Sequence, residues 1–183
     1  MATETIYLDH AATSPLVPEA ADAFVEASRV CGNASALHRA GQRAKARLEE
    51  AREELAAALD AHPSEVVFTS GGSEADSLAV LGGWHARPGR DRVLVSAIEH
   101  PAVLGAAERG AEVIPVAPVG SVDPAVLAEM LDERVAVVSV MAVNNETGVI
   151  QPVEELRRRA HEAGAWMHSD AVQALGHTPL SFR

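Results

Sequence analysis

The sequence predicts an α/β domain with three layers, α/β/α, built around a mostly parallel sheet. Short apolar segments typical of buried strands alternate along the chain with segments of helical apolar spacing. Residues 135–143 are apolar almost throughout, as expected for a strand whose two faces are both covered by helices. Polar residues directly follow several of these strands, and in open α/β sheets ligands bind at the carboxyl ends of strands.

Composition and charge restrict the class of protein. The 183 residues are 48% hydrophobic, which is enough for one domain with a sizeable core. No apolar run approaches the length of a membrane span, and the formal net charge of -11 argues against nucleic acid or an anionic membrane surface as the main partner. Residues 1–9 lack the pattern of a secretory signal, so the cytosol is the expected compartment. Cys31 is the only cysteine, and we expect it to be a buried, inert thiol.

The first part of the chain is predicted to be an extended segment followed by two helices. We expect the extended segment over residues 1–17 and a single large domain over residues 18–183. Residues 18–30 have apolar positions at helical spacing, with proline in the first turn. Residues 38–59 form the longest helical pattern, with a leucine stripe and charged outer faces, so this helix is expected to pack and to do no chemistry.

The centre of the pattern is a strand, a glycine turn and a helix start. Residues 66–68 favour a strand, Gly71 and Gly72 allow a sharp turn, and Ser73 opens a helical segment. The unpaired N–H groups of such a helix start suit an anion, above all a phosphate. Ser73 with Asp76 three residues later also fits a capping box, so an ordinary N-cap is the alternative.

The second half of the chain alternates strands and helices. Strands are predicted at 92–96, 112–116, 135–143 and 165–169, with helices after Pro101, at 123–131 and at 152–163. Polar side chains at the carboxyl ends of predicted strands are the candidate site residues: Ser73, His100, Asn145 and Asp170, with Gln173 close enough to reach the same cavity.

Each candidate also has a plainer interpretation. His100 before Pro101 could only cap a helix, and Asn145 could only serve the turn of its loop. Asp170 is more informative, because a carboxylate after an apolar strand needs a cationic or hydrogen-bonding partner. His168 and Asp170 lie on one face of a strand, as two metal ligands would, but no third ligand is evident and no metal site is predicted.

Six ordered motifs resemble the cysteine desulfurases, which are class V, fold type I enzymes that use pyridoxal 5'-phosphate (PLP). The resemblance runs from Ile6 to the last residues of the chain. The motifs are 8–13 (LDHAAT), 32–35 (GNAS) with His38 and Arg39, 68–74 (FTSGGSE), 99–100 (EH), 143–148 (VNNETG) and 168–173 (HSDAVQ).

The resemblance implies the PLP-binding large domain of a fold type I transferase, and it gives the candidates roles. The Gly72 amide and the Ser73 hydroxyl would hold the PLP phosphate. Asp170 would pair with the pyridine nitrogen, because a nearby carboxylate favours the protonated, electron-accepting ring. His100 would lie over the ring as the catalytic residue for proton transfer.

Further positions follow from the same resemblance. Asn145 and Gln173 would hydrogen-bond near the ring hydroxyl. Asn33 and the loop of Ala11 and Ala12 would border the substrate. The implied reaction takes sulfur from L-cysteine, leaves L-alanine and passes the sulfur to an acceptor protein for iron-sulfur clusters or other sulfur compounds. Full-length relatives are homodimers, so a homodimer is expected.

The resemblance covers only the first part of the family's length. In the family, the lysine that binds PLP covalently lies downstream of the Asp-x-x-Gln motif, and this sequence ends at Arg183 before that point. Lys45 is the only lysine, and its place in the packing helix excludes it from that role. Cys31 does not match the family's persulfide cysteine. We therefore expect the chain alone to be inactive by the usual route, and its uncovered sheet edge to favour self-association.

Two alternatives stay open at this point. The first is a non-catalytic remnant of the PLP fold, or a half-protein that acts with a second chain. The second is another class V enzyme, such as a selenocysteine lyase or an aminotransferase.

Overall fold

The computed structural model describes residues 6–182, and the chain divides into two compact units. The first unit comprises the chain up to Phe68 together with the segment from Leu180, and the second comprises Thr69–Pro179. The predicted division at residue 17 stays a prediction, and residues 1–5 and 183 of its two ranges lie outside the described part of the chain.

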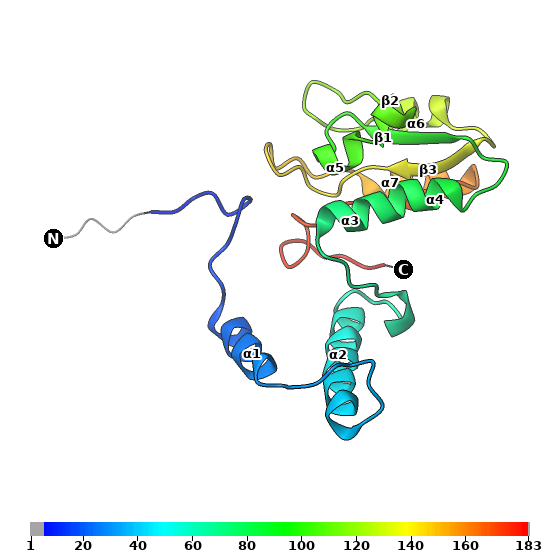
Figure 1. Cartoon of the computed structure of the whole chain (residues 1–183). Helices are drawn as coiled ribbons and strands as arrows, with labels where there is room; N and C mark the ends of the chain where they lie inside the picture. The colour runs from blue at the N-terminus through cyan, green and yellow to red at the C-terminus, as the bar shows by residue number, and fades with distance from the viewer. Residues whose placement is uncertain (1–5, 183) are drawn as a thin grey trace. The chain divides into compact units, whose positions relative to one another are not determined.

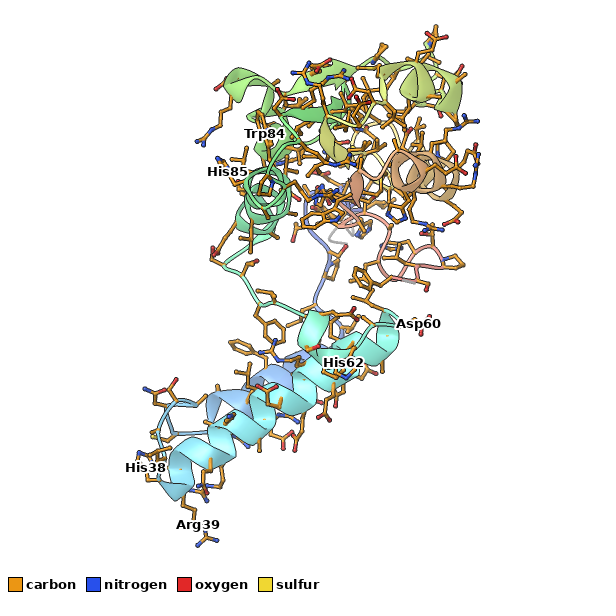
Figure 2. All side chains as sticks on the ribbon, turned by 90° about the vertical axis from the view of Figure 1, so that its right-hand side faces the viewer. His38, Arg39, Asp60, His62, Trp84 and His85 are labelled. Atoms are coloured by element: carbon orange, nitrogen blue, oxygen red, sulfur yellow. The ribbon has the colours of Figure 1, made fainter. Side chains whose placement is uncertain are left out.

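The first unit contains the two predicted helices, and both are confirmed. They are α1, Pro18–Ser28, and α2, Arg39–Ala58, followed by the short helix η1, Pro63–Glu65. His38 begins α2 by accepting a hydrogen bond from the Gly41 amide at 3.2 Å. Figure 2 shows His38 and Arg39 at that end of α2 and Asp60 and His62 just past its other end, where Asp60 has a positive φ of 53° that ends the helix.

Two expectations for this unit are wrong. Cys31 is exposed, because it lies in the turn between α1 and α2 and not under a helix. Residues 66–68 form no strand with any described residue, although the backbone of Val66 is extended. The Val66 carbonyl instead accepts a hydrogen bond from the Arg52 guanidinium at 2.5 Å, and that guanidinium lies 4.8 Å from the centre of the Phe68 ring. Strand-favouring residues therefore give an extended backbone at Val66 without a neighbouring strand to pair with.

The second unit is built on a parallel sheet of four strands (Figure 1). The strands are β1, Arg92–Ser96; β2, Glu112–Ile114; β3, Val135–Ser139; and β4, Trp166–His168. Their order in the sheet is β2-β1-β3-β4, and all three pairings are parallel. All four strands predicted for the second half of the chain are confirmed, although β2 ends at Ile114 instead of at residue 116 and β3 ends at Ser139 instead of at residue 143.

Helices cover both faces of this sheet, which confirms the predicted three layers. On one face Leu94 and Val138 pack with α6, Pro124–Met130, and α7, Val153–Glu162. On the other face Val93, Val95 and Val137 pack with α5, Pro101–Leu104, and with a long helical stretch. That stretch runs from α3, Gly72–Ser77, through the π-helical turn η2, Leu78–Gly82, to α4, Gly83–His85 (Figures 1 and 2).

The packing of the long helical stretch fixes where its first residues lie. Gly83 faces Val137 of the sheet, and a Cβ at this position would lie 3.0 Å from the Val137 side chain. The stretch therefore approaches the sheet closely at its C-terminal end, and its other end extends toward the carboxyl ends of the strands, where it packs against α5.

Within residues 6–182, no helix combines the length and the apolar character needed to cross a bilayer.

Candidate functional site

The start of α3 is an open glycine turn. Gly71 is the N-cap residue, and no side chain caps the helix. A Cβ built at Gly71 or Gly72 would meet no atom within 4 Å, so a ligand has room to approach both backbone amides. Ser73 lies in the first turn, is exposed and makes no side-chain hydrogen bond to the described part of the chain. The capping-box alternative for Ser73 and Asp76 is therefore wrong, and the Ser73 hydroxyl is available to a ligand.

A different pair closes the turn before α3. The Glu74 carboxylate accepts hydrogen bonds from the Ser70 amide at 2.7 Å and from the Ser70 hydroxyl at 2.6 Å. These bonds lower the pKa of Glu74, so its carboxylate is anionic at neutral pH. They also hold Ser70 and Glu74 together and occupy the Ser70 amide, so the Gly71 and Gly72 amides and the Ser73 hydroxyl are among the groups that can meet an anion.

His100 lies at the start of α5, the helix that packs against α3. Its Nδ1 accepts a hydrogen bond from the Ala102 amide at 3.2 Å, so the predicted helix cap exists. Because Nδ1 is the acceptor, the neutral ring carries its proton on Nε2. The ring is exposed, and its Nε2 side is free to serve a ligand while Nδ1 holds the helix.

The loop after β3 contains two asparagines, Asn144 and Asn145, whose side chains have different surroundings. The buried Asn144 side chain accepts hydrogen bonds from the amides of Glu146 and Thr147, at 3.1 and 2.9 Å, and donates one to the Ile98 carbonyl at 3.0 Å. Asn144 therefore builds the turn. Asn145 lies within that turn, as its plainer interpretation expects, and its side chain is exposed and makes no hydrogen bond within residues 6–182.

Asp170 lies just past β4 and is half-buried. Its Oδ1 accepts a hydrogen bond from the Val172 amide at 3.0 Å, and its main-chain carbonyl accepts one from the Ala142 amide at 2.8 Å. Gln173 is half-buried on the turn that begins at Ala171, whose carbonyl accepts from the Ala174 amide at 2.9 Å. Asp170, with its carboxylate, and Gln173, with its side-chain amide, thus belong to the same segment at the carboxyl end of β4.

Asp76 is a buried carboxyl group that sequence reasoning assigned only to a helix cap. It is 6% exposed, and burial together with the negative charge of Asp170 raises its pKa to about 6, while His100 acts in the opposite direction. These electrostatic effects place the start of α3, His100 and Asp170 in one neighbourhood. A signal existed in the sequence: Asp76, Val80 and Gly83 share helical spacing, so a carboxylate lies in the stripe that faces the sheet.

His168 connects Asp76 to the sheet. Its Nδ1 lies 2.9 Å from the Ser139 hydroxyl on β3, and its Nε2 lies 3.6 Å from Oδ1 of Asp76. Burial lowers the pKa of His168, so the ring is neutral at physiological pH and its contact with Asp76 is not a charged ion pair. No three His, Cys, Asp or Glu side chains in residues 6–182 are grouped in a way that could hold a metal ion.

Glu99 is the second buried carboxyl group that sequence reasoning missed. It is 4% exposed, and its Oε1 accepts hydrogen bonds from the Ser96 hydroxyl at 2.5 Å and from the Met141 amide at 2.6 Å. Burial raises the pKa of Glu99, and the charges of Asp170 and Asp76 act in the same direction. Nothing in the Glu-His-Pro sequence distinguishes this buried acid from a solvated one.

Three further predicted residues belong to the first compact unit. Asn33 lies in the turn between α1 and α2, where its Oδ1 accepts a hydrogen bond from the Ser35 amide at 2.9 Å. Ala11 and Ala12 follow Asp9, whose carbonyl accepts a hydrogen bond from the Ala12 amide at 3.3 Å. Their place on the substrate side stays a prediction.

The groups in the second unit suit PLP. A phosphate fits the open glycine turn with its amide and hydroxyl donors, and a protonated pyridine ring fits a neighbourhood of carboxyl groups. Two buried side-chain oxygens, Glu99 Oε2 and Ser169 Oγ, have no hydrogen-bond partner within the described residues. The acidic groups of this neighbourhood, Asp76, Glu99 and Asp170, act electrostatically on one another and on histidines, and no lysine or arginine contributes to the shifts of Asp76 or Glu99.

Comparison with protein families and curated proteins shows what the chain is similar to. The sequence profile of the family "Aminotransferase class-V" matches residues 6–183. The chain is 48% identical over 189 residues to the IscS-like cysteine desulfurase of Mycobacterium tuberculosis, covering 96% of this chain and 48% of that protein. It is 42% identical over 187 residues to a cysteine desulfurase of Sinorhizobium fredii, covering 97% of this chain and 48% of the relative. The chain thus spans about half the length of these curated relatives.

Solved structures give the same result for the fold. A NifS-like protein superposes with a TM-score of 0.88 at 33% identity, covering 97% of this chain and 51% of the other. DndA from Streptomyces lividans superposes with a TM-score of 0.76 at 41% identity, covering 92% of this chain and 50% of the other.

Proposed function

This chain belongs to the aminotransferase class V family, and we propose that it forms the PLP-binding half of a cysteine desulfurase. The observation that carries the proposal is the arrangement of the second unit, where the open turn before Ser73, the exposed ring of His100 and the carboxylate of Asp170 share one neighbourhood at the carboxyl ends of parallel strands. The relatives named above are cysteine desulfurases, which favours this reaction over a selenocysteine lyase or an aminotransferase.

Five side chains and one amide would hold PLP. The Gly72 amide and the Ser73 hydroxyl would bind the phosphate at the start of the helix, with the partial positive charge of the helix end behind them. Asp170 would bind the pyridine nitrogen. Asn145 and Gln173 would hydrogen-bond near the ring hydroxyl, and His100 would cover the ring. When bound, PLP supplies an electron sink for charge that develops on the substrate.

The chain's own residues would then have separate tasks. The Asp170 carboxylate would hold a proton on the ring nitrogen, because an anion next to that nitrogen favours its charged form. His100 moves a proton at Nε2, since Nδ1 is already committed to the Ala102 amide. The family resemblance implies that Asn33, Ala11 and Ala12 would border the substrate. The catalytic lysine and the persulfide cysteine of the family lie in sequence that corresponds to the other half of the relatives.

The proposed substrate is L-cysteine, with L-alanine as one product. Sulfur would pass to an acceptor protein and serve iron-sulfur clusters or other sulfur compounds. We propose a homodimer in the cytoplasm as the working form, with neither nucleic acid nor a membrane as a partner. The net charge of -11 favours this choice of partners, because it opposes binding to polyanions.

Retention of PLP by the chain tests the cofactor half of the proposal. The chain incubated with PLP and then desalted is expected to keep the cofactor, as measured by its absorbance. Ser73→Ala is expected to weaken PLP binding about 3- to 10-fold, because one hydroxyl bond to the phosphate is lost. Ser77→Ala is the matched control. Ser77 is also exposed and lies one helical turn after Ser73, and its substitution is expected to leave the affinity for PLP unchanged.

Equal affinities for Ser73→Ala and for the unmodified chain would contradict the phosphate site. The reaction itself is tested by mixing the chain and PLP with the C-terminal half of a matched relative, adding L-cysteine and dithiothreitol, and measuring alanine and sulfide. Dithiothreitol supplies the two electrons that release the transferred sulfur as sulfide. Both products in equal amounts are expected, and the formation of neither would contradict the proposed reaction.

A further inference from the structure

Glu99 joins the two loops that carry His100 and Asn145. Glu99 lies on the loop after β1, and its Oε1 accepts a hydrogen bond from the Met141 amide at 2.6 Å. Met141 is the second residue after β3. A second bond runs the other way, from the Asn144 side chain to the Ile98 carbonyl at 3.0 Å. The segment just before His100 and the segment just before Asn145 are thus held together by two bonds in opposite directions.

The surroundings of Glu99 are those of a neutral acid. Both donors, the Ser96 hydroxyl and the Met141 amide, converge on Oε1, whereas Oε2 is buried with no partner in the described residues. No lysine or arginine pairs with this carboxyl group in residues 6–182, and Asp76 and Asp170 are the charged groups that act on it. An anionic oxygen left without a donor in such a place costs far more than a protonated one.

We propose that Glu99 is a positioning residue that stays protonated and fastens the loop of His100 to the loop of Asn145. A neutral Glu99 accepts its two hydrogen bonds through the carbonyl oxygen and adds no third negative charge beside Asp76 and Asp170. It therefore fixes the geometry of the site while the charge next to the bound ring remains that of Asp170. The effect on PLP binding rests on the proposed function, but the fastening of the two loops does not.

The unmodified chain gives the first test. With 13C-labelled glutamate carboxyl groups, the Glu99 resonance is expected to remain that of a protonated acid at a neutral pH, where Glu155, whose pKa is lowered to about 2 by its hydrogen bond with Arg158, is ionised. A Glu99 resonance that is that of a carboxylate at the same pH would overturn the proposal. This measurement needs neither a variant nor PLP.

Two variants distinguish the role of Glu99 as a hydrogen-bond acceptor from any role of its charge. Glu99→Gln keeps a carbonyl oxygen for Ser96 and Met141, whereas Glu99→Leu leaves both donors buried without a partner. Hydrogen exchange at the Met141 amide is expected to accelerate about 10- to 100-fold in Glu99→Leu and to stay within about threefold in Glu99→Gln. The His100 ring resonance is expected to shift only in Glu99→Leu. Glu146→Leu, an exposed glutamate in the same loop region, is the control and is expected to change neither readout.

PLP binding adds the functional readout. Glu99→Leu is expected to weaken it about tenfold, and Glu99→Gln is expected to restore it to nearly that of the unmodified chain. If Glu99→Gln loses as much PLP affinity as Glu99→Leu, Glu99 is not a neutral acid in the unmodified chain. If hydrogen exchange at the Met141 amide is unchanged in Glu99→Leu, Glu99 does not fasten the two loops. Failure of the unmodified chain to retain PLP would contradict the proposed function, and exchange and the His100 resonance would then decide the role of Glu99.

Discussion

Replacing Asp170 with asparagine is expected to weaken PLP binding about 10- to 100-fold, because a charge-assisted hydrogen bond to the ring nitrogen is lost. Asparagine has nearly the same shape, and its oxygen can keep the bond that Oδ1 accepts from the Val172 amide at 3.0 Å. The substitution therefore removes the charge and preserves the turn. Fluorescence titration of the chain with PLP measures the change in dissociation constant.

An analogue of PLP with C–H in place of the ring nitrogen is the matched control for Asp170→Asn. It offers no nitrogen to the carboxylate, so the unmodified chain and the variant are expected to bind it equally. If Asp170→Asn weakens the binding of both compounds to the same extent, the carboxylate acts on the fold of the segment and not on the ring. Such a result would remove Asp170 from the proposed cofactor site.

The strands and helices of the second unit were predictable because each is specified locally. The apolar segments at β1 and β3 need two covered faces, and Asp123 and Pro124 mark the start of α6 through a cap and a fixed φ angle. The strand expected at residues 66–68 was wrong for the opposite reason. Local preference sets an extended backbone at Val66, but a strand also requires a partner that no local pattern specifies.

The polar ends of the strands were predictable, and the buried acids among them were not. Asp170 and His100 stand out because they lie at the carboxyl ends of predicted strands. Asp76 was assigned to a helix cap, since Ser-x-x-Asp fits that pattern, although its helical spacing with Val80 and Gly83 was a signal that its carboxyl group faces the sheet. Glu99 stood out only as part of the Glu-His motif, and nothing indicated its burial, because its partners Ser96 and Met141 come together only when β1 and β3 pair.

The acidic groups of the site disfavour one another's negative charge. Burial and the charge of Asp170 both disfavour the anionic form of Asp76, and its nearest imidazole, His168, is neutral. A protonated pyridine ring would supply the positive charge that this neighbourhood lacks. The same arrangement that lowers the stability of the free chain would therefore favour the cofactor, a common exchange of stability for function.

Asp76→Asn is accordingly expected to stabilise the second unit at about pH 8 by roughly 1–3 kcal/mol and to have little effect near pH 4. The ordinary pKa of this carboxyl group is 3.8, and the fold raises it to about 6. Between these values the folded state holds a proton that the unfolded state has released, so the stability of the unmodified chain falls as the pH rises through this window. Above it the whole penalty is present, and asparagine, which cannot ionise, removes it.

Urea unfolding followed by tryptophan fluorescence measures this difference, because both tryptophans, Trp84 and Trp166, lie in the second unit. Asp91→Asn is a control of opposite sign: the Arg134 guanidinium lowers the pKa of Asp91, so its neutralisation should lower stability slightly at about pH 8. A stability gain in Asp76→Asn that is equal at both pH values would show that packing, and not charge, is responsible. In that case the raised pKa of Asp76 would no longer explain why the free site favours a cation.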